Sequence, residues 1–193
     1  DWDGDVTVAT GGLVVTVEDD VPAPLEGSVF GYVDEDELTG GNTDNDDDET
    51  TTRGSLSSLF AFGADQPGNF SIREIGYIDG EAVLTTGGKA LYSLGEQVFY
   101  SYESATVLYG RTSGGENIFC LALDAKSGDY TFELLRQLDH PDANGDDDEV
   151  MTVDLTDVVQ ATDRDGDTVF ATGSFVIQVE DDVPEATLAT VSG

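Results

Sequence analysis

The feature that most constrains the fold of this chain is a 22-residue segment that occurs twice. Residues 1–22 and residues 163–184 align without a gap, and 14 of the 22 paired positions are identical. The copies are 162 residues apart, which is too long for a solenoid repeat and indicates a domain repeated in tandem. We therefore expect a C-terminal hairpin and linker of a preceding repeat in residues 1–24, a full module in residues 25–184, and the start of the next linker in residues 185–193.

The charge of the chain limits its partners. It has 41 acidic and 7 basic residues and a formal net charge of −34, so it cannot neutralise the phosphates of nucleic acid or bind an anionic membrane. No apolar run is long enough to insert into a membrane. The acids are clustered, with 16 acids and no Lys or Arg in residues 1–52, against 10 acids and 6 bases in residues 53–138. Clustered carboxylates repel one another unless a cation lies among them, which favours bound metal over the alternative of a solvated, halophile-like surface.

Short β-branched and aromatic runs between glycine-rich turns predict the fold class. Two pairs of runs, 6–10 with 13–17 and 168–172 with 175–179, are expected to form equivalent hairpins. Further strands are expected at 96–102, 106–109, 117–123 and 129–135, with weaker candidates at 70–75 and 81–85, a turn at 124–128, and single helical turns at 55–60 and 155–159. This pattern predicts an all-β protein, an antiparallel β-sandwich stabilised by calcium.

Carboxylates at alternate positions are the strongest candidates for metal ligands. Asp163, Asp165 and Asp167 surround Gly166, and a tight loop can turn such side chains toward one point, as the 6–8 oxygen ligands of Ca²⁺ require. The loop is not an EF-hand, because its twelfth residue is Ser174 rather than Glu, so other ligands must come from elsewhere. The same spacing occurs at Asp1, Asp3 and Asp5, at Asp142, Asn144 and Asp146, and at Asn42, Asp44 and Asp46.

Other acids lie where one module would meet the next. A proline follows each acidic run and limits the swing of the joint. Carboxylates there could share calcium between neighbours, although a merely soluble linker is the alternative. The chain has one cysteine and one histidine, which excludes an internal disulfide and disfavours zinc, while Mg²⁺ prefers to keep its waters. The candidate ligands in this set are Asp19, Asp20, Asp181 and Asp182, together with Asp139.

Two other functions remain open. Tyr100 and Tyr102 project from the same face of an expected strand; exposed, they could stack on a sugar in a glycan- or peptide-binding module, or they could complete the core. Paired carboxylates also occur in polysaccharide hydrolases, but acids are so abundant here that such a pair would arise by chance. His140 is expected to be a structural residue rather than a catalytic base.

Several stretches along the module resemble the long repeats of giant RTX-type adhesins exported by type I secretion. They are residues 33–38, 54–59, 62–65, 130–135, 138–141, 163–167 and 179–184. The resemblance implies a secreted, calcium-dependent, non-enzymatic module of a bacterial surface fibre that mediates attachment and biofilm formation. Its partners would be adjacent repeats of the same chain, with host or surface glycans bound by other domains. The chain has no glycine-rich nonapeptide array, so we expect an extender or scaffold part.

Overall fold

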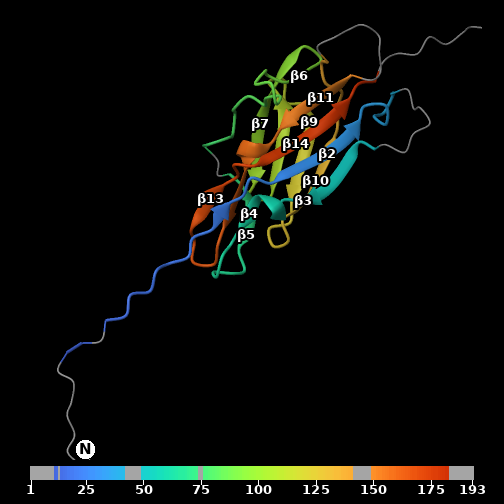
Figure 1. The fold of residues 1–193 in the computed structure, drawn as a ribbon. Helices are drawn as coiled ribbons and strands as arrows, with labels where there is room; N and C mark the ends of the chain where they lie inside the picture. Colours follow the sequence, from blue (N-terminus) through green and yellow to red (C-terminus); the bar gives the residue numbers. More distant parts are fainter. Residues whose placement is uncertain (1–10, 13, 42–48, 74–75, 141–148, 183–193) are drawn as a thin grey trace, which may run out of the picture.

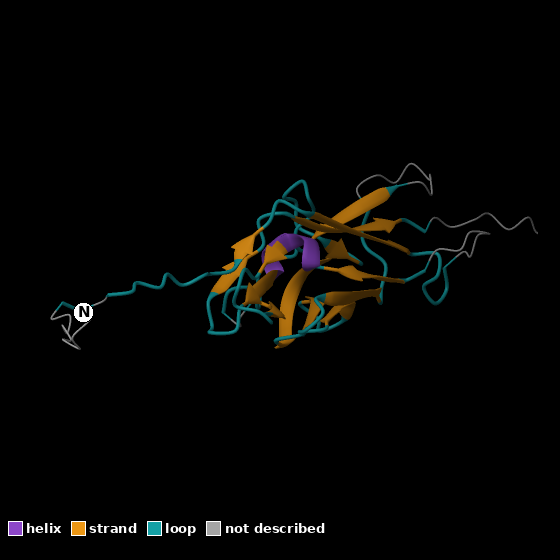
Figure 2. Cartoon of the chain, turned by 60° about the horizontal axis from the view of Figure 1, so that its bottom comes forward, coloured by secondary structure: helices purple, strands orange, loops and turns teal. Residues whose placement is uncertain are grey.

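The structure, a computed structural model of the 193-residue chain, describes residues 11–12, 14–41, 49–73, 76–140 and 149–182. Strands dominate this part of the chain, and its helices are the single 3₁₀ turns η1 (Ser57–Leu59) and η2 (Thr156–Val158) (Figure 2). The all-β prediction is therefore confirmed, and both turns fall within the two segments expected to form them. No helix in the described ranges has the length and apolar character needed to cross a membrane.

One layer of the sandwich is a six-stranded antiparallel sheet in the order β3-β10-β9-β8-β7-β6. Its four long central strands match the four central strands expected from the sequence. Gly128 ends the turn between two of them with φ +74°, and a Cβ there would meet the ring of Phe70. The strands are β3 (Thr51–Ser55), β10 (Asp129–Leu134), β9 (Asn117–Leu123), β8 (Val107–Thr112), β7 (Glu96–Ser104) and β6 (Tyr92–Ser93).

The facing layer is a three-stranded sheet of β11 (Val150–Asp154), β14 (Ser174–Glu180) and β2 (Ser28–Asp34) (Figure 1). β14 pairs with β2 in parallel over its whole length, so the antiparallel prediction does not hold for this pair, although it holds for the other described pairs. Because the first and last long strands of the module run side by side, both end at the same edge of the sandwich. The chain segments that follow them emerge next to each other.

A smaller region closes the end of the sandwich near the N-terminal segment (Figure 1). It holds a three-stranded antiparallel sheet and the pairing of β1 with β4, which attaches the incoming chain to the module. The strands here are β5 (Asn69–Ile72), β12 (Val159–Thr162), β13 (Thr168–Phe170), β1 (Ala23–Pro24) and β4 (Phe60–Ala61).

Aromatic side chains fill the core between the layers. Phe119 and Phe132 stack with ring centroids 5.1 Å apart, and Tyr130 on β10 meets Phe175 on β14 at 4.8 Å. All four are buried, and burying each such side chain contributes about 1.5–3 kcal/mol. Gly110 makes room for this packing, because a Cβ there would come within 2.1 Å of the Phe119 ring.

The prediction that residues 168–172 and 175–179 form a hairpin is wrong. β13 pairs with β12, whereas β14 pairs with β11 and β2 in the facing sheet. Between the two runs the chain crosses at Gly173, where a Cβ would lie 2.3 Å from the backbone oxygen of Gly27. The two apolar runs therefore serve different sheets, and Gly173 marks a close backbone approach rather than a hairpin turn.

The expected strand at residues 13–17 is not formed over its described part. Val14, Val15 and Val17 lie outside any strand and are 85%, 72% and 86% exposed. A strand needs a neighbouring strand for its backbone hydrogen bonds, and residues 14–17 pair with none of the described strands. Its expected partner, residues 6–10, lies outside the described residues. The weaker candidate at 81–85 makes only isolated bridges, and that at 70–75 corresponds to β5, which ends at Ile72.

Candidate metal centre

A tight loop between β12 and β13 carries the first group of carboxylates. Oδ1 of Asp163 accepts hydrogen bonds from the backbone N–H groups of Gly166 (3.0 Å) and Asp167 (2.8 Å). Gly166 has φ +113°, a conformation that glycine adopts without strain. The loop thereby brings one carboxylate oxygen each of Asp163, Asp165 and Asp167 within 4.8 Å of one another.

A second group adds residues that are distant in sequence. The β1–β4 pairing lays the incoming chain against the loop that follows β4, and Oδ2 of Asp20 accepts a hydrogen bond from the N–H of Ala64 at 2.6 Å. This contact positions Asp19 so that its carboxylate oxygen lies within 4.8 Å of those of Asp65 and Asp165. The two groups share Asp165, so five aspartates gather at this end of the module.

Burial and mutual repulsion make this cluster receptive to a cation. Asp163 is only 3% exposed, and its Oδ2 is buried without a hydrogen-bond partner among the described residues. Burial alone would raise the pKa of Asp163, but hydrogen bonds from Asp165 and from backbone N–H groups lower it. The hydrogen bond to the Asp163 carboxyl raises the pKa of Asp165 to about 6, and the charges of Asp163, Asp19 and Asp167 add to this.

The donor set of this cluster suits a hard cation. Every candidate ligand atom is a carboxylate oxygen, the kind of ligand that Ca²⁺ and Mg²⁺ prefer. A bound cation would cancel the repulsion among the aspartates and would give the buried Asp163 oxygen a partner. The cluster can therefore hold a metal ion, and we refer to its five aspartates as the aspartate cluster.

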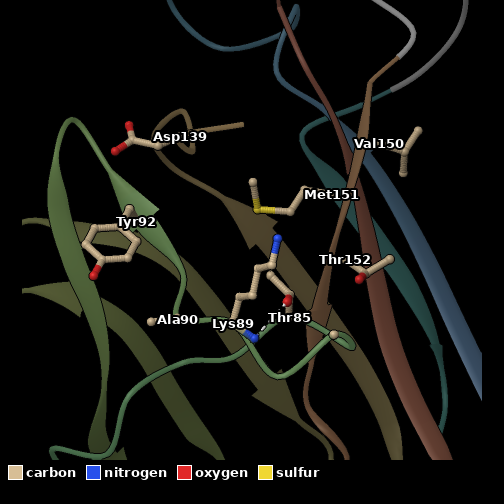
Figure 3. Close-up of a pocket in the computed structure, with 9 residues that line it drawn as sticks. Thr85, Lys89, Ala90, Tyr92, Asp139, Val150, Met151 and Thr152 are labelled. Carbon is tan, nitrogen blue, oxygen red and sulfur yellow. Dashed lines mark hydrogen bonds between the residues drawn. The ribbon is translucent and has the colours of Figure 1, made fainter. Parts of the chain in front are cut away.

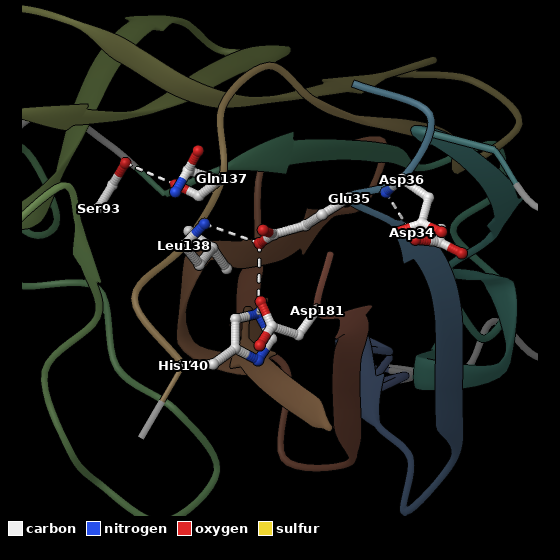
Figure 4. A network of polar contacts seen from close by, with 8 residues as sticks. All are labelled: Asp34, Glu35, Asp36, Ser93, Gln137, Leu138, His140 and Asp181. Carbon is white, nitrogen blue, oxygen red and sulfur yellow. Dashed lines mark hydrogen bonds and ion pairs between the residues drawn. The ribbon is translucent and has the colours of Figure 1, made fainter. Parts of the chain in front are cut away.

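A third group lies at the opposite end of the module, where β2 and β14 end. Glu35, His140 and Asp181 each offer a ligand atom within 4.8 Å of the others (Figure 4). Nε2 of His140 lies 3.3 Å from Oε1 of Glu35 and 3.9 Å from Oδ1 of Asp181. Burial raises the pKa of Glu35 despite its hydrogen bond with His140. The burial of His140 would lower its pKa, but the contact with Glu35 together with the charges of Asp181 and Glu149 outweighs this and raises the pKa.

Sequence reasoning missed Glu35, Asp65 and His140 as possible ligands. Glu35 belongs to an acidic run that resembles a solvated turn. However, the inward-facing positions of β2 include Val29 and Val33, and the two-residue period of a strand continues that face to Glu35. That periodicity was a usable signal, whereas no sequence signal links Asp65 to Asp163.

The other predicted ligands do not join these groups. Asp139 lies outside them, and its Oδ2 accepts a hydrogen bond from the N–H of Gly95 at 2.7 Å. Asp20 binds the Ala64 backbone, and Asp182 is absent from the groups found among the described residues. The remaining predicted ligands lie outside the described residues: Asp1, Asp3, Asp5, Asn42, Asp44, Asp46, Asp142, Asn144 and Asp146.

Of the two alternatives for Tyr100, stacking on a sugar or completing the core, the structure shows the second. Its side chain is only 7% exposed, and its hydroxyl donates a hydrogen bond to the backbone oxygen of Asp154 at 2.9 Å. Tyr102 is partly buried against the same core. Strand alternation places both residues on the face of β7 that the sandwich covers, so Tyr100 completes the core and cannot stack on a sugar.

A pocket of about 450 Å³ lies between the segment that precedes β6 and β11 (Figure 3). Lys89, Tyr92, Asp139 and Met151 contribute to its lining. The Asp139 carboxylate already binds the Gly95 backbone, so the pocket contains no cluster of ligand groups comparable to those at the two ends of the module.

Comparison with known proteins finds a family model that matches this chain. A family model described as a domain of unknown function (DUF5801) matches residues 32–175, from within β2 to the start of β14. No curated protein and no solved structure matches the chain. The matched range includes Asp65, His140 and the Asp163 loop, while Asp19 and Asp181 flank it. Since the match covers most of its length, the chain belongs to the DUF5801 family.

Proposed function

We propose that this chain is a non-enzymatic structural module of a bacterial surface adhesin, in which calcium stiffens the joint between successive repeats. The observation that carries the proposal is the position of Asp19. This residue belongs to the first copy of the repeated segment, yet its carboxylate lies within 4.8 Å of Asp65 and Asp165 of the following module. A cation at this point would bind the tail of one repeat to the body of the next.

Calcium suits this site better than other common cations. Ca²⁺ takes 6–8 oxygen ligands in flexible geometry and accepts carboxylates with one or two oxygens. The aspartate cluster offers oxygen ligands from three separate segments of chain. Mg²⁺ dehydrates reluctantly and demands near-ideal octahedral geometry, so a cage made mostly of protein carboxylates favours Ca²⁺.

Calcium would make folding of the chain depend on whether it is inside or outside the cell. Where calcium is scarce, repulsion among the 41 acidic residues keeps the chain expanded, as export requires. Outside the cell, calcium at about 10⁻⁴–10⁻³ M is in the range that extracellular modules bind, and binding would lock the joint. Spacing and stiffening the fibre would hold a distal adhesive domain away from the cell, in support of attachment and biofilm formation.

Calcium titration with thermal unfolding tests this proposal. Filling a site to 100 times its Kd stabilises the fold by about 2.7 kcal/mol, which corresponds to a rise in Tm of about 5–10 °C for a protein of this size. Asp165→Asn should remove most of the rise, whereas Asp129→Asn should keep it, since Asp129 is exposed on β10 and outside the ligand groups. A Tm that is the same in calcium and in chelator would refute the proposal.

A further inference from the structure

The Glu35, His140 and Asp181 group differs from the aspartate cluster in its donors and its burial. The side chains of Glu35 and His140 are each 2% exposed, and that of Asp181 is 18% exposed. An imidazole nitrogen and two carboxylate oxygens form a donor set typical of first-row transition metals, whereas Ca²⁺ binds oxygen ligands. We propose that these three residues form a second metal site, for a divalent transition metal ion such as Zn²⁺, at the C-terminal end of the module.

The fold brings the two carboxylates together through the parallel pairing of β2 with β14. The last pair in that register is Asp34 with Glu180, so Glu35 and Asp181 are the next residues on adjacent strands. The N–H of Glu35 donates to the backbone oxygen of Glu180 at 3.2 Å, which holds the two segments in line beyond the sheet. The site therefore rests on regular backbone structure.

The histidine reaches the same point from the segment that leaves the six-stranded sheet. The N–H of Leu138 donates to Oε1 of Glu35 at 2.7 Å (Figure 4). The N–H of Asp139 donates to the backbone oxygen of Tyr92 at 2.8 Å. These bonds fix the backbone on the approach to His140. Nδ1 of His140 is buried without a hydrogen-bond partner among the described residues, so no such bond holds the ring against a small shift toward a shared ion.

The spacing of the ligand atoms is close to that of a metal site. Bonds of about 2.0–2.2 Å at tetrahedral or octahedral angles place two ligand atoms about 3.0–3.5 Å apart. Nε2 of His140 is already 3.3 Å from Oε1 of Glu35, and its 3.9 Å separation from Oδ1 of Asp181 would need to shorten by only a few tenths of an ångström. We expect a rotation of the Asp181 side chain to supply this change, because this side chain is the most exposed of the three.

The charge at this site also calls for a cation. Two carboxylates face one imidazole, and the charges of Glu149 and Asp182 act on His140 and Asp181 respectively. His140 is the ion-pair partner found for Glu35 and Asp181 in the described part of the chain, and one proton on it balances only one negative charge. A buried, uncompensated charge is costly, so a divalent ion would stabilise the group more than a proton does.

The composition of the chain disfavours zinc only when histidines and cysteines alone are counted. The chain has one of each, but Zn²⁺ also accepts Asp and Glu oxygens at about 2.0–2.2 Å. The fold supplies two such carboxylates beside the histidine. A metal ion here would join the end of β2, the His140 segment and the start of the exit segment, and would thereby fasten the end of the module that faces the next repeat.

The single histidine makes the test direct. The tag-free chain, with calcium present throughout, is titrated with Zn²⁺ while the imidazole proton resonances are followed by NMR, and every imidazole signal then belongs to His140. We expect these resonances to shift and to saturate at one equivalent. Asp181→Asn should weaken this binding about tenfold or more, since even outer-shell changes cost 10–100-fold, and Glu35→Gln should act in the same direction.

Two controls keep the result interpretable. The Asp181 side chain is the most exposed of the three, so its variant should fold even if the buried change at Glu35 does not. Asp129→Asn should bind Zn²⁺ like the unaltered chain. Imidazole resonances that do not move at several equivalents of Zn²⁺ would overturn the proposal, as would unchanged affinity in Asp181→Asn. Because calcium saturates the aspartate cluster in each sample, failure here would leave the calcium proposal intact.

Discussion

The two copies of the repeated segment share most of their sequence, but their described parts differ in structure. In the second copy, β14 lies between β11 and β2, and Val179 is fully buried. Its equivalent in the first copy, Val17, is 86% exposed and lies outside any strand. An identical residue in a similar local sequence therefore lies in the core or in solvent, depending on whether neighbouring strands are present.

The comparison also assigns two environments to one linker residue. Asp181 lies beside Glu35 and His140 of its own module, whereas its equivalent Asp19 lies beside Asp65 and Asp165 of the following module. In an array, each linker aspartate would lie between two environments: the Glu35 and His140 group of the module before it, and the Asp65 and Asp165 group of the module after it. Under the proposed function, the acidic linker would be shared by two modules, and removing calcium should affect only the contact ahead.

The largest expected effect is the release of the first copy when calcium is removed. The N–H of Ala64, which donates to Asp20, should exchange with solvent about 100-fold faster in chelator, because a site filled to 100 times its Kd contributes about 2.7 kcal/mol. The N–H of Ile177 within β14 serves as the control, because its exchange rate should change only with global unfolding. Hydrogen exchange followed by NMR measures both amides, and equal protection of Ala64 with and without calcium would argue against a calcium-dependent joint.

A matched pair of substitutions tests the difference in packing between the copies. Val179→Ala should destabilise the fold by about 1.5–3 kcal/mol, since it removes buried methyl groups and leaves a cavity. Val17→Ala should change stability by less than about 0.5 kcal/mol, as is usual for exposed positions. Chemical denaturation measures both. A comparable loss in Val17→Ala would show that the first copy packs on the module.

Much of the fold follows from sequence pattern, because strand periodicity is a local property. The runs at 117–123 and 129–135 are strands as predicted, and Gly128 takes the expected positive φ. Which strand a given strand pairs with is not a local property of the sequence. Residues 168–172 and 175–179 were predicted to form a hairpin, but each run pairs in a different sheet, because long-range packing against β12, β11 and β2 decides where each run goes.

The candidate sites also combine features that local sequence predicts with contacts that only the fold produces. The alternation of Asp163, Asp165 and Asp167 is visible in the sequence, and their carboxylates do converge. Asp65 and Glu35 join their groups through the loop after β4 and through the parallel register of β2 with β14, and neither contact can be read from local sequence. The sequence left two alternatives for Tyr100, because strand alternation separates two faces without saying which one the core covers; the structure places it in the core.

Substitutions at the paired linker aspartates should separate the two ends of the module. Asp19→Asn should weaken calcium binding about tenfold, because it removes a charged ligand candidate from the aspartate cluster and a charge-assisted contact is worth roughly 1.5–3 kcal/mol. Asp181→Asn should leave the calcium affinity within about twofold, since it lies in the other group. Calorimetric titration with Ca²⁺ measures both affinities. Equal losses of calcium affinity in the two variants would mean that calcium binds at both ends of the module or binds neither end specifically.

The smallest expected effect is a dependence of calcium affinity on pH. The hydrogen bond to Asp163 raises the pKa of Asp165 to about 6, whereas an unfolded aspartate titrates near pH 3.9. Between about pH 4 and 6 the ion-free folded state therefore holds more protons than the unfolded state, and its stability should fall as the pH rises. Calcium competes with that proton, so its affinity should rise through about pH 6 and then level off. Asp165→Asn removes the titrating group and should flatten this profile, and a flat profile in the unaltered chain would show that Asp165 is not a ligand.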